Sequence, residues 1–243
     1  IILIKILNRP ISIKHRPFII AEMSANHNQS LSNALKIIDK AKQAGVDAIK
    51  IQTYTPDTLT IKSSRKEFTI TDKSSIWYNQ NLYNLYKKAY TPWDWHQKIF
   101  DYSKKKGLIC FSSPFDLSAV EVLKKLNCPA YKIASPEITH IPLIEKIAST
   151  KKPIILSLGL SSIKDTELAL KTIKKKGNLK VAILQCVASY PAEINEQNLL
   201  AIKELIKKYK ILVGLSDHTL GYISPITSIA LGAKIIEKHF NIK

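Results

Sequence analysis

Apolar runs of strand length alternate with helical patterns along most of the chain. The runs cover residues 18–21, 48–51, 108–111, 130–134, 154–156, 181–184, 211–215 and 234–236. Apolar residues at helical spacing fill the intervals at 31–44, 93–105, 117–126, 143–149, 163–175, 195–209 and 224–231. Eight strands alternating with helices predict an α/β fold of the TIM (β/α)8 barrel type. The alternative, a doubly wound sheet, lacks the Gly-rich fingerprint that would follow its first strand.

The two ends of the chain depart from this alternation. Residues 3–7 and 11–14 flank Asn8-Arg9-Pro10 and predict a short hairpin on the barrel floor. We assign 1–17 to this hairpin and 18–243 to the barrel, the catalytic domain. The pattern stops shortly after His239, so we expect a barrel truncated after strand eight, without its eighth helix.

One connection is unusually long. Residues 53–91 lie between a strand and the next helix, and they are rich in aromatic side chains: Trp77, Tyr78, Tyr83, Tyr86 and Tyr90. Loops at the carboxyl ends of barrel strands build active sites. This loop is therefore predicted to be a lid.

The composition fits one soluble domain. A chain of 243 residues with 45% hydrophobic residues has about the length of one barrel. It has no apolar run long enough to span a bilayer, and the N-terminal residues do not form a signal peptide, so we expect a cytoplasmic protein. The cysteines Cys110, Cys128 and Cys186 lack metal-site spacing and are expected to be buried, reduced thiols.

The formal charge of +18 could indicate a polyanionic partner or an anionic substrate. Lysines cluster at 104–106, 124–125, 174–176 and 207–208, at the ends of predicted helices. There they favour the helix dipole and face solvent, spread around the fold rather than along one groove. We therefore expect no nucleic-acid or membrane partner, and steering of an anionic small substrate stays open.

Two histidines follow neighbouring strands near the end of the chain. His218 lies in Gly-Leu-Ser-Asp-His-Thr at 214–219, and His239 lies in Glu-Lys-His-Phe at 237–240. A strand, helix, strand unit places both on one rim of the barrel. Neutral imidazole is the commonest metal ligand, so the pair beside Asp217 and Glu237 predicts a site for Mn²⁺, Zn²⁺ or Fe²⁺. A satisfied structural histidine is the alternative for each.

Polar residues close the predicted strands, where a barrel places its catalytic groups. They are Glu22, Lys50, Gln52, Ser112, Ser113, Lys132, Ser135, Glu137, Ser157, Tyr190, Ser216, His218, Glu237 and His239. Lys50 and Lys132 lie inside strands, where an ammonium group is costly unless an anion meets it. With the hydroxyl groups nearby, they predict a phosphate or carboxylate pocket. Any one of these residues taken alone could be a turn serine or a lysine reaching solvent.

Several segments resemble the sialic acid synthase family. They include Phe-Ile-Ile-Ala-Glu at 18–22, Ala-Asn-His-Asn at 25–28, Lys-Ile-Gln-Thr-Tyr at 50–54, Ser-Ser-Pro-Phe-Asp at 112–116 and Tyr-Lys-Ile-Ala-Ser at 131–135. Both histidine segments match as well, and residues 22–30, 52–58 and 83–93 are most similar to the pseudaminic acid synthase branch. These enzymes condense phosphoenolpyruvate with an acetamido-hexose to give a nine-carbon keto acid.

The resemblance implies roles for individual residues. His218 and His239 would ligate a divalent metal, for which we expect Mn²⁺. Phosphoenolpyruvate would be held by Lys50, Ser113, Lys132, Ser135, Ser157 and Ser216. The sugar or the reacting carbons would face Glu22, Gln52, Glu137, Tyr190 and Glu237. Either Glu22 or Glu137 could position or deprotonate the attacking water.

The sequence also departs from the family pattern. The usual Ser-Thr-Gly after strand five is Ser157-Leu158-Gly159 here, and Ala188 replaces a polar residue after strand six. The C-terminal antifreeze-like domain, which in relatives completes the partner's site in a homodimer, is expected to be absent from this chain. Two alternatives to a synthase therefore stay open: a Schiff-base aldolase using Lys50 or Lys132, and an inactive remnant.

Overall fold

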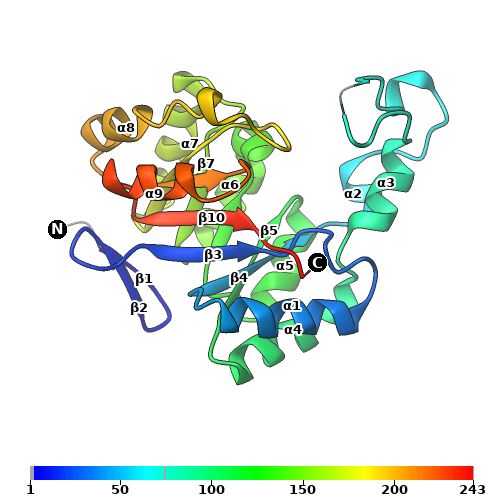
Figure 1. Cartoon of the computed structure of the whole chain (residues 1–243), viewed down its shortest axis with the longest axis horizontal. Helices are drawn as coiled ribbons and strands as arrows, with labels where there is room; N and C mark the ends of the chain where they lie inside the picture. Colours follow the sequence, from blue (N-terminus) through cyan, green and yellow to red (C-terminus); the bar gives the residue numbers. More distant parts are fainter. Residues whose placement is uncertain (1–2, 74, 243) are drawn as a thin grey trace.

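Eight parallel strands close a barrel in the computed structural model, which describes residues 3–73 and 75–242. Neighbouring strands in sequence pair in order, and the last strand pairs with the first to close the ring (Figure 1). The strands are β3 (Phe18–Glu22), β4 (Ala48–Thr53), β5 (Ile109–Pro114), β6 (Tyr131–Ile133), β7 (Ile154–Ser157), β8 (Val181–Cys186), β9 (Leu212–Asp217) and β10 (Ile235–His239). The predicted TIM barrel is confirmed.

Helices cover the outside of this barrel. They are α1 (Leu31–Gln43), α4 (Trp93–Lys105), α5 (Leu117–Lys125), α6 (Ile141–Ser149), α7 (Ile163–Lys175), α8 (Ala201–Tyr209) and α9 (Ile223–Ala230). The first of them illustrates why these segments are helical. The Ser30 side chain caps α1 by accepting from the Asn33 N–H, and lysines in the last turn complement the dipole. Its buried residues Ala34, Ile37, Ile38 and Ala41 form one stripe against the strands.

The pleat of the strands divides the barrel interior into two zones. In β3, Phe18 and Ile20 share a face with Glu22, and in β10, Ile235 shares a face with Glu237. Apolar side chains therefore fill the amino-terminal part of the barrel, and charged side chains fill the carboxyl-terminal part. Contacts between β6 and β10 residues across the ring, described below, place this charged face inside the barrel.

Gly214 permits a close approach within this wall. A Cβ atom at this position would lie 2.7 Å from the Cβ of Ile235 and 2.7 Å from the Cδ2 of Leu184, and it would overlap the Ile235 carbonyl oxygen. Any larger residue would push apart β9 and the side chains on the strands beside it. The barrel closes in the observed way because this position has no side chain.

The N-terminal hairpin covers the barrel floor, but its turn is tighter than predicted. Strands β1 (Leu3–Ile6) and β2 (Arg9–Ser12) pair with Leu3 opposite Ser12 and Ile6 opposite Arg9. The predicted arms, 3–7 and 11–14, left three residues for the turn. Only Leu7 and Asn8 turn the chain, because Leu7 takes a left-handed φ of 50°. Ile4, Ile6 and Ile11 are buried in the same core as Phe18.

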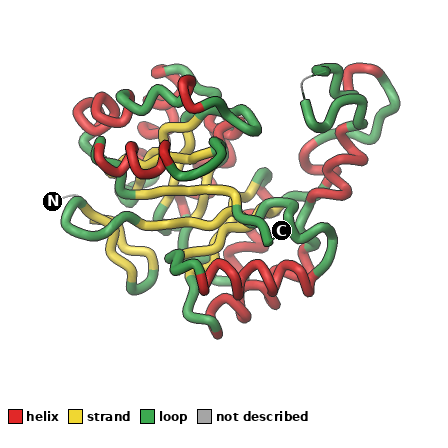
Figure 2. Tube along the Cα trace, viewed as in Figure 1, coloured by secondary structure: helices red, strands yellow, loops and turns green. Residues whose placement is uncertain are grey.

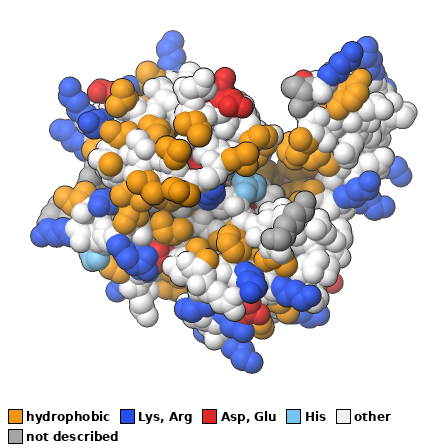
Figure 3. Space-filling model, in the orientation of Figure 1, with side chains coloured by type: hydrophobic (Ala, Val, Ile, Leu, Met, Phe, Trp, Pro, Cys, Tyr) orange, Lys and Arg blue, Asp and Glu red, His pale blue; other side chains and the backbone are white. Residues whose placement is uncertain are grey.

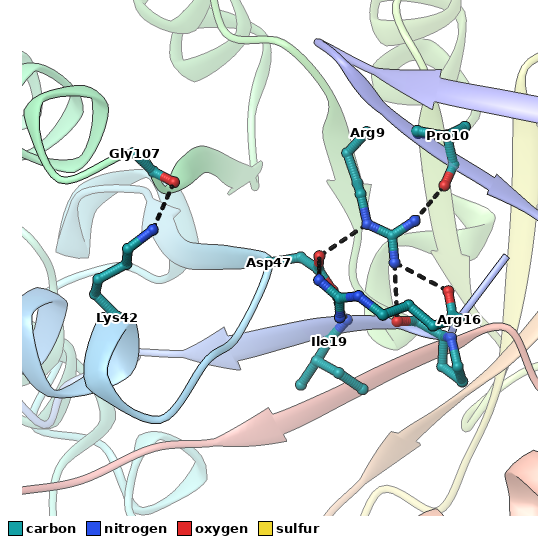
Figure 4. Close-up of polar contacts among 8 residues, drawn as sticks. Arg9, Pro10, Arg16, Ile19, Lys42, Asp47 and Gly107 are labelled. Atoms are coloured by element: carbon teal, nitrogen blue, oxygen red, sulfur yellow. Dashed lines mark hydrogen bonds and ion pairs between the residues drawn. The ribbon is translucent and has the colours of Figure 1, made fainter.

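A buried carboxylate fixes the hairpin to the barrel (Figure 4). Asp47, just before β4, accepts from Arg9 Nε at 2.8 Å, from Arg16 Nη2 at 2.6 Å and from the Ile19 N–H at 2.9 Å. The guanidinium of Arg9 also donates to the carbonyl oxygens of Arg16 and Pro17. These bonds join β2, the linker that follows it and β3 around one side chain.

The long connection after β4 contains short helices rather than one open loop. These are α2 (Pro56–Leu59), the 3-10 turn η1 (Lys66–Phe68) and α3 (Leu82–Ala89). Figures 1 and 2 show this segment standing beside the carboxyl-terminal side of the barrel. We refer to residues 55–91 as the lid.

The helix predicted at 195–209 is shorter in the structure. Only a 3-10 turn, η3 (Ile194–Glu196), forms at its start, and α8 begins at Ala201. Asn198 takes a left-handed φ of 44°, and the buried Gln197 side chain donates to the Glu193 carbonyl oxygen. These local bonds compete with the helix and hold the segment as a loop.

No helix in the part of the chain that the structure describes is long and apolar enough to cross a membrane.

Candidate active site

Two lysines and two glutamates meet inside the carboxyl-terminal end of the barrel. Lys132 Nζ lies 2.8 Å from Glu237 Oε1, although the two residues come from β6 and β10. Lys50 Nζ lies 2.5 Å from Glu22 Oε2 and 3.6 Å from Glu237 Oε1. All four side chains are almost completely buried. We call these four residues the charged cluster.

The cluster separates the acidities of its two carboxyl groups. Burial raises the pKa of Glu22 and outweighs the attraction of Lys50. Burial also acts on Glu237, but Lys132 and Lys50 together outweigh it and lower its pKa to about 2. When the pKa values of two carboxyl groups differ in this way, one group can carry a proton and the other can remain a permanent anion. Glu22 is the group of this pair able to exchange a proton.

The ammonium group of Lys50 stays charged. Burial alone would lower its pKa, but the ion pairs with Glu22 and Glu237 outweigh burial and raise it. A Schiff-base lysine needs a neutral amine and hence a lowered pKa. The geometry therefore disfavours an aldolase that uses Lys50 as its nucleophile.

Hydroxyl groups surround the charged cluster. Ser113 Oγ accepts from Lys50 Nζ at 3.2 Å, and Ser216 Oγ donates to Glu237 Oε1 at 3.5 Å. Ser157 closes β7 and is buried, and its Oγ has no hydrogen-bond partner among the described residues. The same is true of Glu237 Oε2. Buried polar atoms without partners mark a place for a ligand or ordered water.

Ser135 has a partner of its own. Its Oγ accepts from the Leu160 N–H at 2.6 Å, across the turn that follows β7. A Cβ atom at Gly159 would lie 3.1 Å from this hydroxyl and 3.0 Å from Cys186 Sγ. The Ser-Leu-Gly turn thus packs closely against Ser135.

All three cysteines are free and buried, as predicted.

Aromatic rings gather at the rim next to the charged cluster. Tyr190 lies 4.1 Å from the ring of His218 and 5.5 Å from that of His239, measured between centroids. The two imidazoles are 5.5 Å apart. Trp77 of the lid lies 6.4 Å from Tyr190. Residues from the loop after β9, from β10, from the β8–α8 loop and from the lid therefore meet at one place.

The imidazole pair has properties that fit a divalent metal. Burial lowers the pKa of His218 and of His239 to about 4, so both rings are neutral at pH 7. His218 Nδ1 donates to the Val187 carbonyl oxygen at 2.7 Å, which leaves the lone pair on Nε2. Neutral imidazoles held in this way are ligands for Mn²⁺, Zn²⁺ or Fe²⁺.

The carboxylates predicted beside the histidines do not complete a metal site. Asp217 faces the outside of the barrel, where it pairs with Lys238 and accepts from the Thr219 N–H and hydroxyl group. Glu237 is engaged by Lys132. Within the described ranges no group of three or more His, Cys, Asp or Glu side chains could hold a metal. Asp217 is therefore turned away from the imidazole pair, and His218 and His239 as metal ligands stay a prediction.

Two predicted site residues lie outside the network of contacts. Gln52 is half-buried on β4, opposite Ser113 in the strand register. Glu137 lies in the 3-10 turn η2 (Ser135–Thr139), and its side chain has no hydrogen-bond partner among the residues described. Burial raises the pKa of Glu137. Within the described part of the chain, neither residue has an ion pair with a lysine, unlike Glu22, and the one charged group that acts on the pKa of Glu137 is His140, which lowers it less than burial raises it.

Sequence reasoning missed the contacts of the 25–28 motif. Asn26 Nδ2 donates to the Phe240 carbonyl oxygen at 2.9 Å and so ties β10's end to the β3–α1 loop. His27 is buried, and its ring contacts Trp95 and Thr91. The resemblance included the Ala-Asn-His-Asn motif, but the sequence does not show that the end of β10 lies opposite it, so no role could be assigned to Asn26 or His27.

A cavity of about 950 Å³ lies at the other end of the barrel. It is bounded by the hairpin, the turn before β4, the start of β5 and the last turns of α1 and α4, and none of the predicted site residues lines it. The charged cluster, the imidazole pair and the lid all lie at the carboxyl ends of the strands. Parallel barrels carry their active sites there, so we place the candidate site at that end.

Comparison with known proteins agrees with this architecture. The NeuB family matches residues 37–243. The chain is 45% identical to the pseudaminic acid synthase of Helicobacter pylori over 224 residues, covering 92% of this chain and 65% of that protein. It is 36% identical to the N,N'-diacetyllegionaminic acid synthase of Campylobacter jejuni over 234 residues, covering 93% of this chain and 68% of that protein.

A solved structure gives the same fold. The N-acetylneuraminic acid synthetase of Leptospira borgpetersenii, in complex with citrate, superposes with a TM-score of 0.88 at 34% identity, over 99% of this chain and 79% of that one. Fold and site thus define a (β/α)8-barrel protein with a polar site at the carboxyl ends of its strands. The chain belongs to the NeuB family. It spans 65% of the length of the Helicobacter relative.

Proposed function

We propose that the protein is a pseudaminic acid synthase. It would condense phosphoenolpyruvate with 2,4-diacetamido-2,4,6-trideoxy-L-altrose to a nine-carbon 2-keto acid, with release of phosphate. The observation that carries the proposal is the charged cluster at the catalytic face of a NeuB-family barrel. The higher identity to a pseudaminic acid synthase, 45% against 36% for a legionaminic acid synthase, favours this sugar over the precursors of legionaminic or neuraminic acid.

The lysines suit an anionic substrate. Lys50 and Lys132 would bind the phosphate and carboxylate groups of phosphoenolpyruvate, assisted by the hydroxyl groups of Ser113, Ser157 and Ser216. In the structure both ammonium groups are held by carboxylates, so they are already ordered at the site. Substrate oxygens would then join or replace these carboxylates without reorganisation of the lysines.

The reaction would form one carbon–carbon bond. C3 of the enol attacks the aldehyde carbon of the open-chain sugar, water adds at C2 of the resulting oxocarbenium ion, and phosphate leaves with cleavage of its C–O bond. Glu22, whose pKa is raised by burial, is the carboxylate we assign to receive the water proton. Glu137 is the second candidate for that step, because burial raises its pKa too.

His218 and His239 would hold the divalent ion, for which we propose Mn²⁺. When bound, it would polarise the sugar aldehyde as a Lewis acid. The fit rests on two neutral, adjacent imidazoles whose pKa values burial lowers to about 4. Tyr190 packs on His218 and orients that ring.

Phosphate release tests the proposal directly. The protein, expressed with its whole natural reading frame, is incubated with phosphoenolpyruvate, Mn²⁺ and either the trideoxy-altrose or N-acetylmannosamine. We expect turnover with the altrose, and no adduct with pyruvate on borohydride reduction, because Lys50 and Lys132 are each held in an ion pair with a buried carboxylate. Turnover with N-acetylmannosamine alone would instead indicate a neuraminic acid synthase. A folded protein that releases no phosphate with either sugar would contradict synthase activity.

A lysine variant tests the pocket assignment. Lys132→Ala should raise the KM for phosphoenolpyruvate by at least about tenfold, since a charge-assisted contact is worth about 1.5 to 3 kcal/mol, and should change the sugar KM much less. Lys98→Ala, an exposed lysine on α4, is the matched control and should leave both constants unchanged. Equal weakening of both substrates by Lys132→Ala would show that the pocket is assigned wrongly.

A further inference from the structure

We propose that Trp77 of the lid and Tyr190 form an aromatic wall that binds the apolar part of the sugar, and that Trp77 favours a 6-deoxy acetamido sugar over a 6-hydroxy one. This inference rests on the proposed function, because it names the group that selects the substrate of the same site. It assigns a specific task to the lid, which the sequence alone describes only as long and aromatic.

The two rings come together from separate parts of the chain. Trp77 lies in the lid between β4 and α4, and Tyr190 lies in the loop after β8. Their ring centroids are 6.4 Å apart with planes tilted by 57°, within the range of favourable aromatic pairs. Through Tyr190, the lid reaches the rim that carries His218 and His239.

Both rings keep surface that a ligand could cover. Trp77 is 38% exposed and Tyr190 is 46% exposed, although both are large apolar side chains. Figure 3 shows a hollow between the lid and the barrel with hydrophobic side chains on both of its sides. A sugar whose aldehyde carbon lies at the imidazole pair would extend its far carbons toward this wall.

The charged cluster and the aromatic wall suit different substrates. The charged cluster and its serines lie inside the barrel and suit the anionic substrate. The aromatic wall carries no charge and suits C–H groups, the methyl groups of acetamido substituents and a methyl group at C6. A hydroxyl at C6 would be placed against the indole without a partner, and this desolvation lowers affinity.

The lid offers a matched control beside Trp77. Tyr78 has similar size and is 48% exposed, but it lines a different pocket of the lid, together with Thr69, Ile70 and Asn79. Loss of Tyr78 therefore tests whether any aromatic side chain in the lid matters. Trp77→Phe, which keeps an aromatic ring, tests whether the chemistry of the wall is sufficient.

Steady-state kinetics of the full-length protein with 2,4-diacetamido-2,4,6-trideoxy-L-altrose and with its 6-hydroxy counterpart, 2,4-diacetamido-2,4-dideoxy-L-altrose, tests the inference. We expect Trp77→Ala to raise the KM of the 6-deoxy sugar about tenfold and to reduce the preference over the 6-hydroxy sugar by a similar factor, the scale of a buried methyl or methylene group. The KM for phosphoenolpyruvate should change less than about twofold. Trp77→Phe should retain most of the preference, and Tyr78→Ala should retain all of it.

Three outcomes would overturn the inference: an unchanged sugar KM in Trp77→Ala, an equal rise in the KM of phosphoenolpyruvate, or the same loss in Tyr78→Ala. Calorimetric titration of each sugar into wild type and Trp77→Ala separates this inference from the proposed function. Weaker sugar binding by Trp77→Ala without any phosphate release from wild type would support the wall and contradict the synthase. No sugar binding by folded wild type would contradict both.

Discussion

The pKa of Glu237 depends on two positive charges from different strands. Lys132 and Lys50 lower its pKa to about 2 against the effect of burial, while Glu22 in the same cluster has a raised pKa. Single substitutions within such a group leave an unpaired charge in the barrel, so their effects on binding and on folding will be coupled. Substitutions of residues next to the cluster avoid this coupling and are easier to interpret.

The imidazole pair gives one such test. His218→Ala or His239→Ala in the full-length protein should abolish both retention of Mn²⁺ after dialysis and turnover, because each removes a neutral imidazole donor. Metal content and phosphate release are the two measurements. Cys110→Ser, a buried thiol on the outer face of β5, should preserve both. Normal activity of metal-stripped His239→Ala would contradict a metal bound by these histidines and needed for turnover.

His96 makes the folded state sensitive to acid for a reason unrelated to catalysis. It is fully buried on α4, its Nε2 lies 2.8 Å from Thr53 Oγ1, and burial lowers its pKa to about 4. The ordinary value is 6.5, so between pH 6.5 and pH 4 the unfolded chain binds the additional proton and stability falls as the pH falls. One such group contributes at most about 1.4 kcal/mol per pH unit.

Urea unfolding at several pH values measures this contribution. The free energy of unfolding of His96→Gln should depend less steeply on pH in that window than that of wild type, by up to about 1.4 kcal/mol per unit. The variant will also be less stable at pH 7. Parallel pH profiles for the two proteins would show that His96 takes up its proton in the folded state.

At the scale of elements, the hairpin and the barrel floor depend on Asp47. Asp47→Asn keeps the shape but removes the charge that Arg9 and Arg16 share, and it should lower the free energy of unfolding by about 2 kcal/mol. Asp101→Asn is the control. Asp101 lines the same 950 Å³ cavity as Asp47 but is exposed on α4, so this substitution should change the free energy of unfolding by less than about 0.5 kcal/mol. Equal effects in chemical denaturation would mean that the hairpin is held by its isoleucines alone.

At the scale of the whole molecule, the net charge of +18 should act on substrate capture. The lysines lie mostly on the outside, but their summed field attracts a polyanion such as phosphoenolpyruvate. Raising ionic strength from about 20 to about 200 mM should lower kcat/KM for phosphoenolpyruvate several-fold, because exposed charges are screened. The KM of the uncharged sugar should stay constant. A salt-independent kcat/KM would mean that only the buried lysines matter.

The homodimer expected from the family resemblance also belongs to this scale. It stays a prediction, and sedimentation of the full-length protein measures it. The aromatic wall and the charged cluster are both built within one chain. The contacts described for them therefore do not depend on a partner subunit.

The sequence by itself determined the barrel and the residue types at its rim. Alternation of apolar runs with helical patterns, without the Gly-rich fingerprint of a doubly wound sheet, predicts the (β/α)8 barrel. The polar residue that follows each run falls at the carboxyl end of the barrel, because parallel strands share their direction. Glu22, Lys50, Lys132, Glu237 and the two histidines could be named on that basis. The helix at 195–209 and the hairpin turn differed, where left-handed residues overrode the pattern. The short helices α2 and α3 within the long connection were not predicted either.

Only the tertiary structure decided which of these residues meet. Periodicity assigns a side chain to a face, but it contains no distance between strands far apart in sequence, such as those carrying Lys132 and Glu237. Barrel closure brings that pair together, turns Asp217 outward toward Lys238 and sets opposite pKa shifts on two glutamates of the same chemistry. The contact between Trp77 and Tyr190 has the same origin, because it depends on how the lid folds back over the rim.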